Sequence, residues 1–144
     1  MNYIKTHGQE LETAYPYTAV TGTCKYSAAS GKVNVNTIAN VTPSSVAQLK
    51  AAIAQGPTSV TVEADTAVFQ QYTGGILNSK ACGTNLDHAI TAVGYGTDAT
   101  AGDYYIVRNS WGASWGAQGY INIAAVDGVG ICGIQQISVW PTTN

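Results

Sequence analysis

The sequence has 144 residues, of which 45% are hydrophobic and only 10% are charged, and its formal net charge is −2. A chain of this length can bury about two-thirds of the surface that its unfolded form exposes, which is enough for one main hydrophobic core. It contains no run of Lys or Arg, and no apolar run of the roughly 18 residues that span a bilayer, so we expect neither nucleic acid nor membrane partners.

The first part of the chain predicts the end of a helix followed by connecting chain. Residues 1–8 have the basic residues and the terminal Gly8 that are typical of the last turns of a helix. Residues 14–27 contain Pro16 and are rich in turn-forming residues, so we expect extended, turning chain there.

One strand and one complete helix are predicted next. In residues 32–41, β-branched residues alternate with polar ones, as in a half-buried strand. Thr42 is a suitable N-cap with Pro43 at the first helical position, and an apolar face then recurs until Gly56 ends the helix.

The rest of the chain predicts short strands separated by polar or Gly-rich turns. They cover residues 58–64, 88–96, 103–111, 119–124 and 134–141. Several short strands with one helix among them predict an α+β protein built on an antiparallel barrel or sandwich.

Three cysteines, Cys24, Cys82 and Cys132, make an odd count. None has the spacing of a zinc site, so we expect no metal; two should pair and one should lack a partner within the chain. This cysteine usage and the low charge density favour an extracellular or lumenal protein over a cytosolic one.

His88 stands at the head of an apolar run, NLDHAITAVGYG, residues 85–96. It is either a structural histidine beside a strand or half of a catalytic pair. Asn109 follows a predicted strand 21 residues later, so an antiparallel hairpin can bring the two side chains face to face. An Asn oxygen can hold an imidazole in one tautomer, and because it adds no charge the pair suits a nucleophile that ionises readily, such as a cysteine thiol.

Longer motifs connect these residues to a known family. DHAITAVGYG, YYIVRNSWGASWGAQGYINI and ICGI resemble the C-terminal part of papain-like cysteine proteases, the cathepsin L-like group, and YIKTHG, YPYTA and GPTSVTVEADTAVFQQYTGGI fit in the same order. The resemblance implies the α+β papain-like fold, with residues 1–34 ending the helical domain and residues 35–144 forming an antiparallel β-barrel domain.

The resemblance also implies roles for individual side chains. His88 would be the general acid/base and Asn109 its orienting partner, while Trp111 would shield their hydrogen bond and Trp115 would line the leaving-group side of the cleft. Asp87, beside the histidine, would modulate the substrate site. Thr61, Leu86, Ala89 and Ile137 would line the subsite before the cleaved bond and favour Leu, Val or Phe over Arg, although plain core packing is the alternative reading of these four.

The nucleophile expected for this family is absent from the sequence. No cysteine stands in a Cys-Gly-Ser/Ala-Cys-Trp/Tyr setting, and His88 has only 87 residues before it, against roughly 130 to 150 in the family. By resemblance Cys82 pairs with Cys132, and Cys24 pairs with a cysteine on an N-terminal segment or chain. We therefore expect this chain alone to be inactive.

The sequence as a whole predicts part of a thiol endopeptidase that acts on peptide or protein substrates without a cofactor. By resemblance we expect a propeptide or cystatin-type inhibitors as partners, and a lysosomal, vacuolar or secreted location. Two rival functions stay open, a papain-like binding module that has lost its thiol and a storage protein. The residue at the nucleophile position would separate the first rival from an enzyme.

Overall fold

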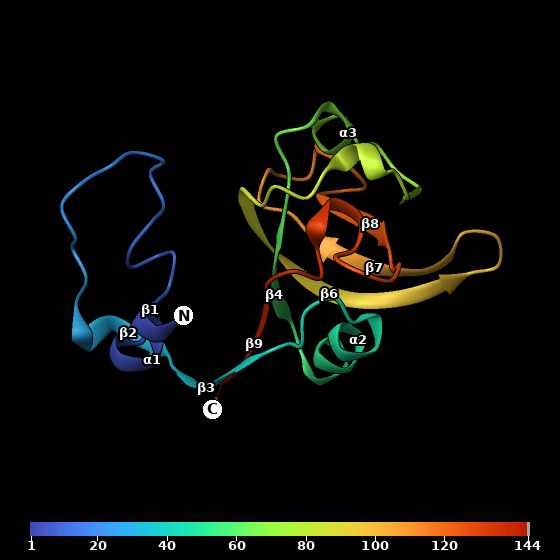
Figure 1. Ribbon diagram of the computed structural model, residues 1–144. Helices are drawn as coiled ribbons and strands as arrows, with labels where there is room; N and C mark the ends of the chain where they lie inside the picture. The colour runs from blue at the N-terminus through green and yellow to red at the C-terminus, as the bar shows by residue number, and fades with distance from the viewer. Residues whose placement is uncertain (144) are drawn as a thin grey trace. The chain divides into compact units, whose positions relative to one another are not determined.

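The structure is a computed structural model that describes residues 1–143, and the chain separates into two compact units. The smaller unit comprises residues 1–39 with the C-terminal segment from Pro141, and the larger comprises residues 40–140. The chain passes between the units twice, once after residue 39 and once after residue 140 (Figure 1). The domain division expected after residue 34 stays a prediction.

The smaller unit has little regular structure. Its elements are α1 (Asn2–His7), β1 (Gln9–Glu10), a 3₁₀ turn η1 (Ala28–Ser30), β2 (Gly31–Val33) and most of β3 (Val35–Asn40). Gly8 ends α1 as predicted, with a φ of 78° and an N–H that donates to the Ile4 carbonyl at 2.8 Å. Residues 11–27 contain no helix or strand, which confirms the connecting chain expected there.

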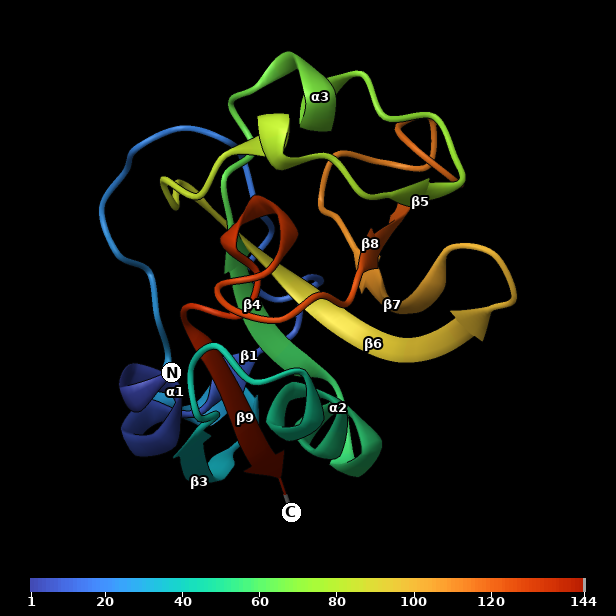
Figure 2. The ribbon, with the colours of Figure 1, turned by 45° about the vertical axis from the view of Figure 1, so that its right-hand side comes forward.

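The larger unit is mainly a sheet with short helices. Its elements are α2 (Val46–Gln55), β4 (Thr58–Val62), α3 (Ala67–Gln70), β5 (Ile76–Leu77), η2 (Lys80–Cys82), β6 (His88–Asp98), β7 (Gly102–Arg108), β8 (Tyr120–Ala124), η3 (Ile131–Gly133) and the first half of β9 (Ser138–Thr143). α2 and α3 lie at opposite ends of β4 (Figure 2). None of the helices in the described chain has both the length and the apolar character needed to cross a bilayer.

The predicted helix is present, but its expected start was wrong. Ser45, not Thr42, is the N-cap, and its Oγ accepts a hydrogen bond from the Gln48 N–H at 3.3 Å. Ser44 has a φ of 57°, a left-handed conformation that prevents the helix from starting at Pro43. The predicted apolar face is buried through Leu49 and Ile53.

The strands pair in the order β3-β9-β4-β6-β7-β8-β5 within residues 1–143. β4, β6, β7 and β8 form consecutive antiparallel pairs, as expected from the sequence, whereas the short strand β5, which was not among the predicted strands, pairs with β8 in parallel. The strand predicted over 134–141 begins only at Ser138, because residues 134–137 form turns that follow the 3₁₀ turn η3. The α+β class is confirmed.

The core of the larger unit lies where β4, β6, β7 and β8 meet α2 and α3. Its fully buried side chains include Leu49, Val60, Val62, Phe69, Tyr105, Val107, Ile121, Ile123 and Ile134. At about 25 cal/mol per Å² of buried apolar surface, each such side chain contributes roughly 1.5 to 3 kcal/mol. The core therefore fixes the ends of β6 and β7, where the candidate catalytic side chains stand.

Candidate active site

His88 and Asn109 meet where two neighbouring strands begin and end. β6 begins at His88 and β7 ends at Arg108, and the two strands run antiparallel with Thr91 opposite Arg108. The His88 Nε2 and the Asn109 Oδ1 are 2.9 Å apart. The structure thus brings together the two side chains that the spacing of 21 residues predicted to face each other.

The Asn109 amide has a fixed orientation. Its Oδ1 also accepts a hydrogen bond from the Ser110 backbone N–H at 2.7 Å, and of the two polar groups of the amide only the oxygen can accept one. The oxygen therefore faces the ring, so the proton of the neutral imidazole must sit on the Nε2 of His88. The Nδ1 lone pair is left to accept a proton from another group.

Asn109 is itself buried, with 7% of its surface exposed. Its backbone N–H donates to the Gly119 carbonyl at 3.0 Å, which ties the residue after β7 to the residue before β8. Within residues 1–143 its Nδ2 has no hydrogen-bond partner. Burial and these bonds hold the amide oxygen against His88.

Trp111 covers one face of the His88 ring. The ring centroids are 5.1 Å apart and the planes are inclined by 26°, so the rings are stacked. The indole keeps 40% of its surface exposed and stands between His88 and solvent on that face. An apolar ring therefore covers this face of the imidazole.

Trp115 packs against Trp111 and against Phe69 of α3. It stacks on Phe69 with centroids 5.2 Å apart, and it meets Trp111 edge-on at 5.3 Å. Its Nε1 donates to the Gln70 carbonyl at 3.0 Å. Sequence reasoning missed α3 and the part that Phe69 plays in placing both tryptophans; Phe69 is the only phenylalanine of the chain.

Asp87 is bound to the chain that follows β4. Its Oδ1 accepts from the Ala64 N–H at 2.8 Å and its Oδ2 accepts from the Asp65 N–H at 3.2 Å. Both carboxylate oxygens therefore bind the backbone that follows β4, and Asp87 directly precedes His88 in the sequence. The pKa of the neighbouring Asp65 is raised above its ordinary value of 3.8, first by desolvation and then by the charges of Asp87 and Glu63.

This raised pKa predicts a pH dependence. The folded chain holds the Asp65 proton more tightly than the unfolded chain, so the associated stability is complete below about pH 3.8 and is lost as pH rises through the raised pKa. Asp65→Asn should therefore raise Tm relative to the parent chain by an amount that grows from about pH 3 to about pH 6. Thermal unfolding monitored by circular dichroism measures it. Asp127→Asn, at an exposed carboxylate, is the control; an equal Tm difference at both pH values would contradict the prediction.

The four apolar subsite candidates lie on neighbouring segments. Thr61 is the strand partner of Ala89 across β4 and β6. Its Oγ1 donates to the Ile137 carbonyl at 3.0 Å, and the Ile137 side chain is 57% exposed. Leu86 lies close to Gly133, where an added Cβ would stand 2.8 Å from its Cδ2. Exposure of Ile137 and Ala89 disfavours plain core packing for these two.

The three cysteines form one disulfide and leave one free thiol, as expected. Cys82 and Cys132 form a disulfide, and both are fully buried between η2 and η3. Cys24 is free and exposed in the smaller unit. Among the described residues no cluster of three or more His, Cys, Asp or Glu could hold a metal ion.

Comparison with known proteins decides the family. The sequence model described as papain family cysteine protease matches residues 1–142. The chain belongs to the papain family. It is 41% identical to papaya proteinase 4 of Carica papaya over 147 residues, which is 100% of this chain and 42% of that protein. It is 38% identical to cathepsin L of Sarcophaga peregrina over 143 residues, covering 97% of this chain and 42% of that protein.

Solved structures agree on the fold. The bromelain protease of Ananas comosus, in complex with the E64 inhibitor, superimposes with a TM-score of 0.90 at 40% identity, covering 98% of this chain and 66% of that one. A cysteine protease of Carica candamarcensis in complex with E-64 gives a TM-score of 0.87 at 39% identity, over 99% of this chain and 66% of that one. The papain-like fold is therefore confirmed, and the chain spans less than half of the curated relatives described above.

Proposed function

We propose that this chain carries the acid/base half of a thiol endopeptidase of the papain type. The observation that supports it most is the contact of 2.9 Å between His88 Nε2 and Asn109 Oδ1, which leaves Nδ1 free to take a proton from a thiol. The nucleophilic cysteine is supplied by a segment outside this sequence.

This geometry supports an acyl-enzyme reaction. The thiol transfers its proton to Nδ1 of His88, and the thiolate attacks the scissile carbonyl carbon. The imidazolium then protonates the leaving amine as the C–N bond breaks, which leaves a thioester. His88 next takes a proton from water, whose oxygen attacks the thioester carbonyl, and the thiolate departs. Asn109 keeps the ring in one orientation throughout, and Trp111 limits access of water to its hydrogen bond.

The substrate is a peptide or protein chain with an apolar side chain before the cleaved bond. Thr61, Leu86, Ala89 and Ile137 offer no acidic group at that subsite, so Leu, Val or Phe fits better than Arg. Trp115, on the leaving-group side, provides a flat apolar surface. Asp87 modulates the site through the chain that it binds after β4.

Changing Ile137 tests the subsite. In the complete enzyme, Ile137→Glu should raise the ratio of kcat/KM for Arg against Leu substrates by about tenfold or more, because the new carboxylate pairs with the guanidinium. Paired fluorogenic peptides that differ only at this position measure it. Val93→Glu, at an exposed position on β6, is the matched control. An unchanged ratio for Ile137→Glu would remove Ile137 from the subsite.

Partners and location follow from the family. The bromelain and Carica candamarcensis structures hold E-64, and we propose that the complete enzyme binds the same inhibitor as well as cystatin-type proteins. A propeptide would keep such an enzyme inactive as a zymogen until it is removed. A lysosomal, vacuolar or secreted location suits the buried disulfide, because such bonds persist in oxidising compartments.

Peptide hydrolysis by the native protein tests the proposal. Purified material that contains this chain should hydrolyse an apolar fluorogenic peptide when a thiol reductant is present, and alkylation of thiols should abolish the activity. Binding of peptide or E-64 without hydrolysis would point instead to the thiol-less binding module. The absence of both hydrolysis and binding would favour a storage role.

A further inference from the structure

Gln135 is a buried polar side chain that the proposed reaction does not use. It is 3% exposed and lies in the turn between η3 and β9. Its Nε2 donates to the Gly128 carbonyl at 2.6 Å, and its Oε1 accepts from the Tyr105 hydroxyl at 2.8 Å. Because a carbonyl can only accept, the amide nitrogen must face Gly128, which leaves the amide oxygen for the tyrosine. Both polar groups of the buried amide therefore have a partner.

Tyr105 brings this contact from the core of the larger unit. It lies in β7 opposite Ile123 of β8, and its side chain is fully buried. Desolvation, followed by the charge of Asp103, raises the pKa of its hydroxyl well above the ordinary 10.0. The hydroxyl therefore keeps its proton, and remains a donor to Gln135, at acid and neutral pH. Gln135 is thus bound to a strand at the centre of the sheet.

The backbone of Gln135 is also bound to two other segments. Its N–H donates to the Val129 carbonyl at 2.9 Å, and its carbonyl accepts from the Ser44 N–H at 2.9 Å. The side-chain and backbone bonds together join this one residue to β7, to the loop before η3 and to the segment before α2. A residue with partners on several segments fixes the turn that contains it.

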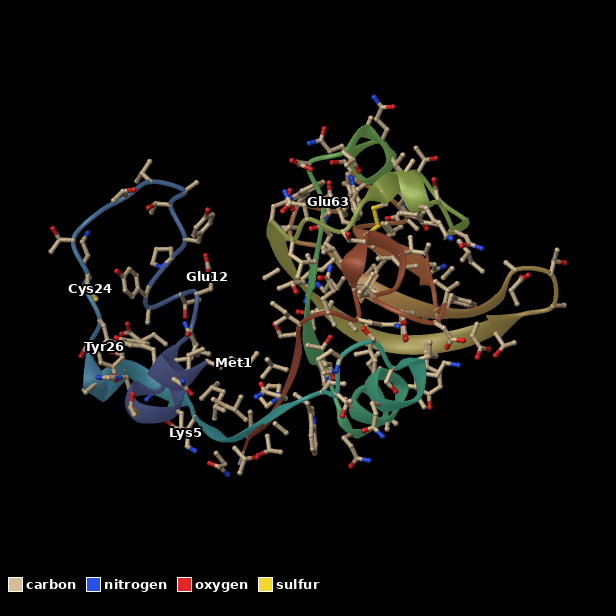
Figure 3. All side chains as sticks on the ribbon, viewed as in Figure 1. Met1, Lys5, Glu12, Cys24, Tyr26 and Glu63 are labelled. Atoms are coloured by element: carbon tan, nitrogen blue, oxygen red, sulfur yellow. A yellow bond between two sulfur atoms is a disulfide. The ribbon has the colours of Figure 1, made fainter. Side chains whose placement is uncertain are left out.

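This turn carries one wall of the proposed subsite. Ile137 follows Gln135 by two residues and lies outside any helix or strand, so its position depends on bonds to neighbouring segments. The Thr61 N–H and Oγ1 both donate to the Ile137 carbonyl, at 3.2 and 3.0 Å. At the other end of the turn, the disulfide of Cys132, a yellow bond in Figure 3, joins the chain to η2. Gln135 supplies a third anchor between these two.

We propose that Gln135 is a positioning residue for the apolar subsite of the complete enzyme. Its contact with Tyr105 fixes the turn that presents Ile137, and so determines how closely the subsite wall fits a bulky substrate side chain. This inference rests on the proposed peptidase and deepens it, because it names a determinant of substrate choice that need not touch the substrate. Without the contact the turn relaxes, and a Leu of the substrate loses contacts that a small Ala never makes.

Tyr105→Phe and Gln135→Met test the inference in the complete enzyme, because each removes one partner of the contact. For paired fluorogenic peptides with Leu or Ala at the subsite position, the ratio of kcat/KM for Leu over Ala should fall by about fivefold or more, through a higher KM for the Leu peptide. The kcat for the Leu peptide should stay within about twofold of the parent value, since His88 and Asn109 are unchanged. Tyr104→Phe, at the next position of β7 and on the opposite face of the sheet, is the matched control and should keep the parental ratio.

The double variant Tyr105→Phe/Gln135→Met covers the case in which a single variant fails to fold. It leaves neither member of the pair buried without its partner, which removes the main cost of the single substitutions. Its ratio of kcat/KM for Leu over Ala should fall as in the single variants, because the turn has still lost its bond to β7.

Three outcomes would count against these claims in different ways. A parental ratio together with a lowered Tm would show that the contact only stabilises the fold, and would overturn the inference. An equal fall in kcat for both peptides would show that the substitutions disturb the catalytic pair and not the subsite, and would overturn it too. If the parent enzyme hydrolyses neither peptide, the proposed peptidase itself fails, and the inference falls with it.

Discussion

Replacing His88 with alanine in the complete thiol-bearing enzyme should lower kcat/KM by about 10³-fold or more, because both proton transfers of the proposed reaction pass through its ring. Asn109→Ala should lower kcat/KM by about 10- to 100-fold, which corresponds to the loss of one hydrogen bond to a charged group. The effect is smaller than for His88→Ala because the ring remains and only its orientation is lost. Steady-state kinetics on an apolar peptide measure both effects. The smaller loss for Asn109→Ala is part of the prediction.

Two further measurements distinguish a catalytic effect of these substitutions from a loss of folding. His7→Ala, at the other histidine of the chain, should keep full activity, because His7 lies in α1 of the smaller unit. A long-range ¹H–¹⁵N spectrum of the neutral parent chain should show the proton of His88 on Nε2, and Asn109→Ala should give a mixture of tautomers. Activity that survives His88→Ala would contradict the catalytic role directly.

Removing the Cys82–Cys132 disulfide should lower the free energy of unfolding by about 4 kcal/mol. The two residues are 50 apart in sequence, and the cross-link restricts the unfolded chain by an amount that grows with the length of this loop. The bond joins η2 to η3, so its loss also loosens the segment that leads into β6. Denaturant unfolding of the Cys82→Ala/Cys132→Ala double variant measures the effect, with the slope m checked for change.

Cys24→Ala is the matched control for the disulfide. Its thiol is exposed and unpaired within the described chain, so the substitution should change stability by no more than about 0.5 kcal/mol. If the free energy of unfolding of the double variant falls by less than about 1 kcal/mol, the prediction is contradicted, and the buried contacts of η2 and η3 keep these segments together without the disulfide.

The sequence predicted those parts of the fold that have a local pattern. The short strand over residues 58–64, the apolar face of α2 and the spacing between His88 and Asn109 all depend on short stretches of sequence, and the structure contains each of them. The start of α2 was predicted three residues early, because the left-handed Ser44 that delays it leaves no compositional signal.

Long-range contacts could not be predicted in the same way. α3 has only four residues, too few for a periodic pattern, yet its Phe69 supports both tryptophans of the candidate site. Asp87 reaches the backbone after β4 because β4 and β6 pair, and that pairing joins residues more than 20 positions apart. β5 was not predicted for a related reason, since a two-residue strand is too short for a sequence pattern and takes its partner from tertiary packing.

Alkylation of the complete protein by iodoacetamide at about pH 5, followed by peptide mapping, shows directly whether His88 takes a proton from a cysteine thiol. An ordinary thiol is almost unreactive at this pH, whereas a thiol whose proton has moved to a neighbouring imidazole reacts rapidly. Rapid alkylation of one cysteine outside residues 1–144 is expected, together with loss of that reactivity in His88→Ala. Absence of any rapidly reacting cysteine, or reactivity unchanged in His88→Ala, would contradict the proton transfer to His88.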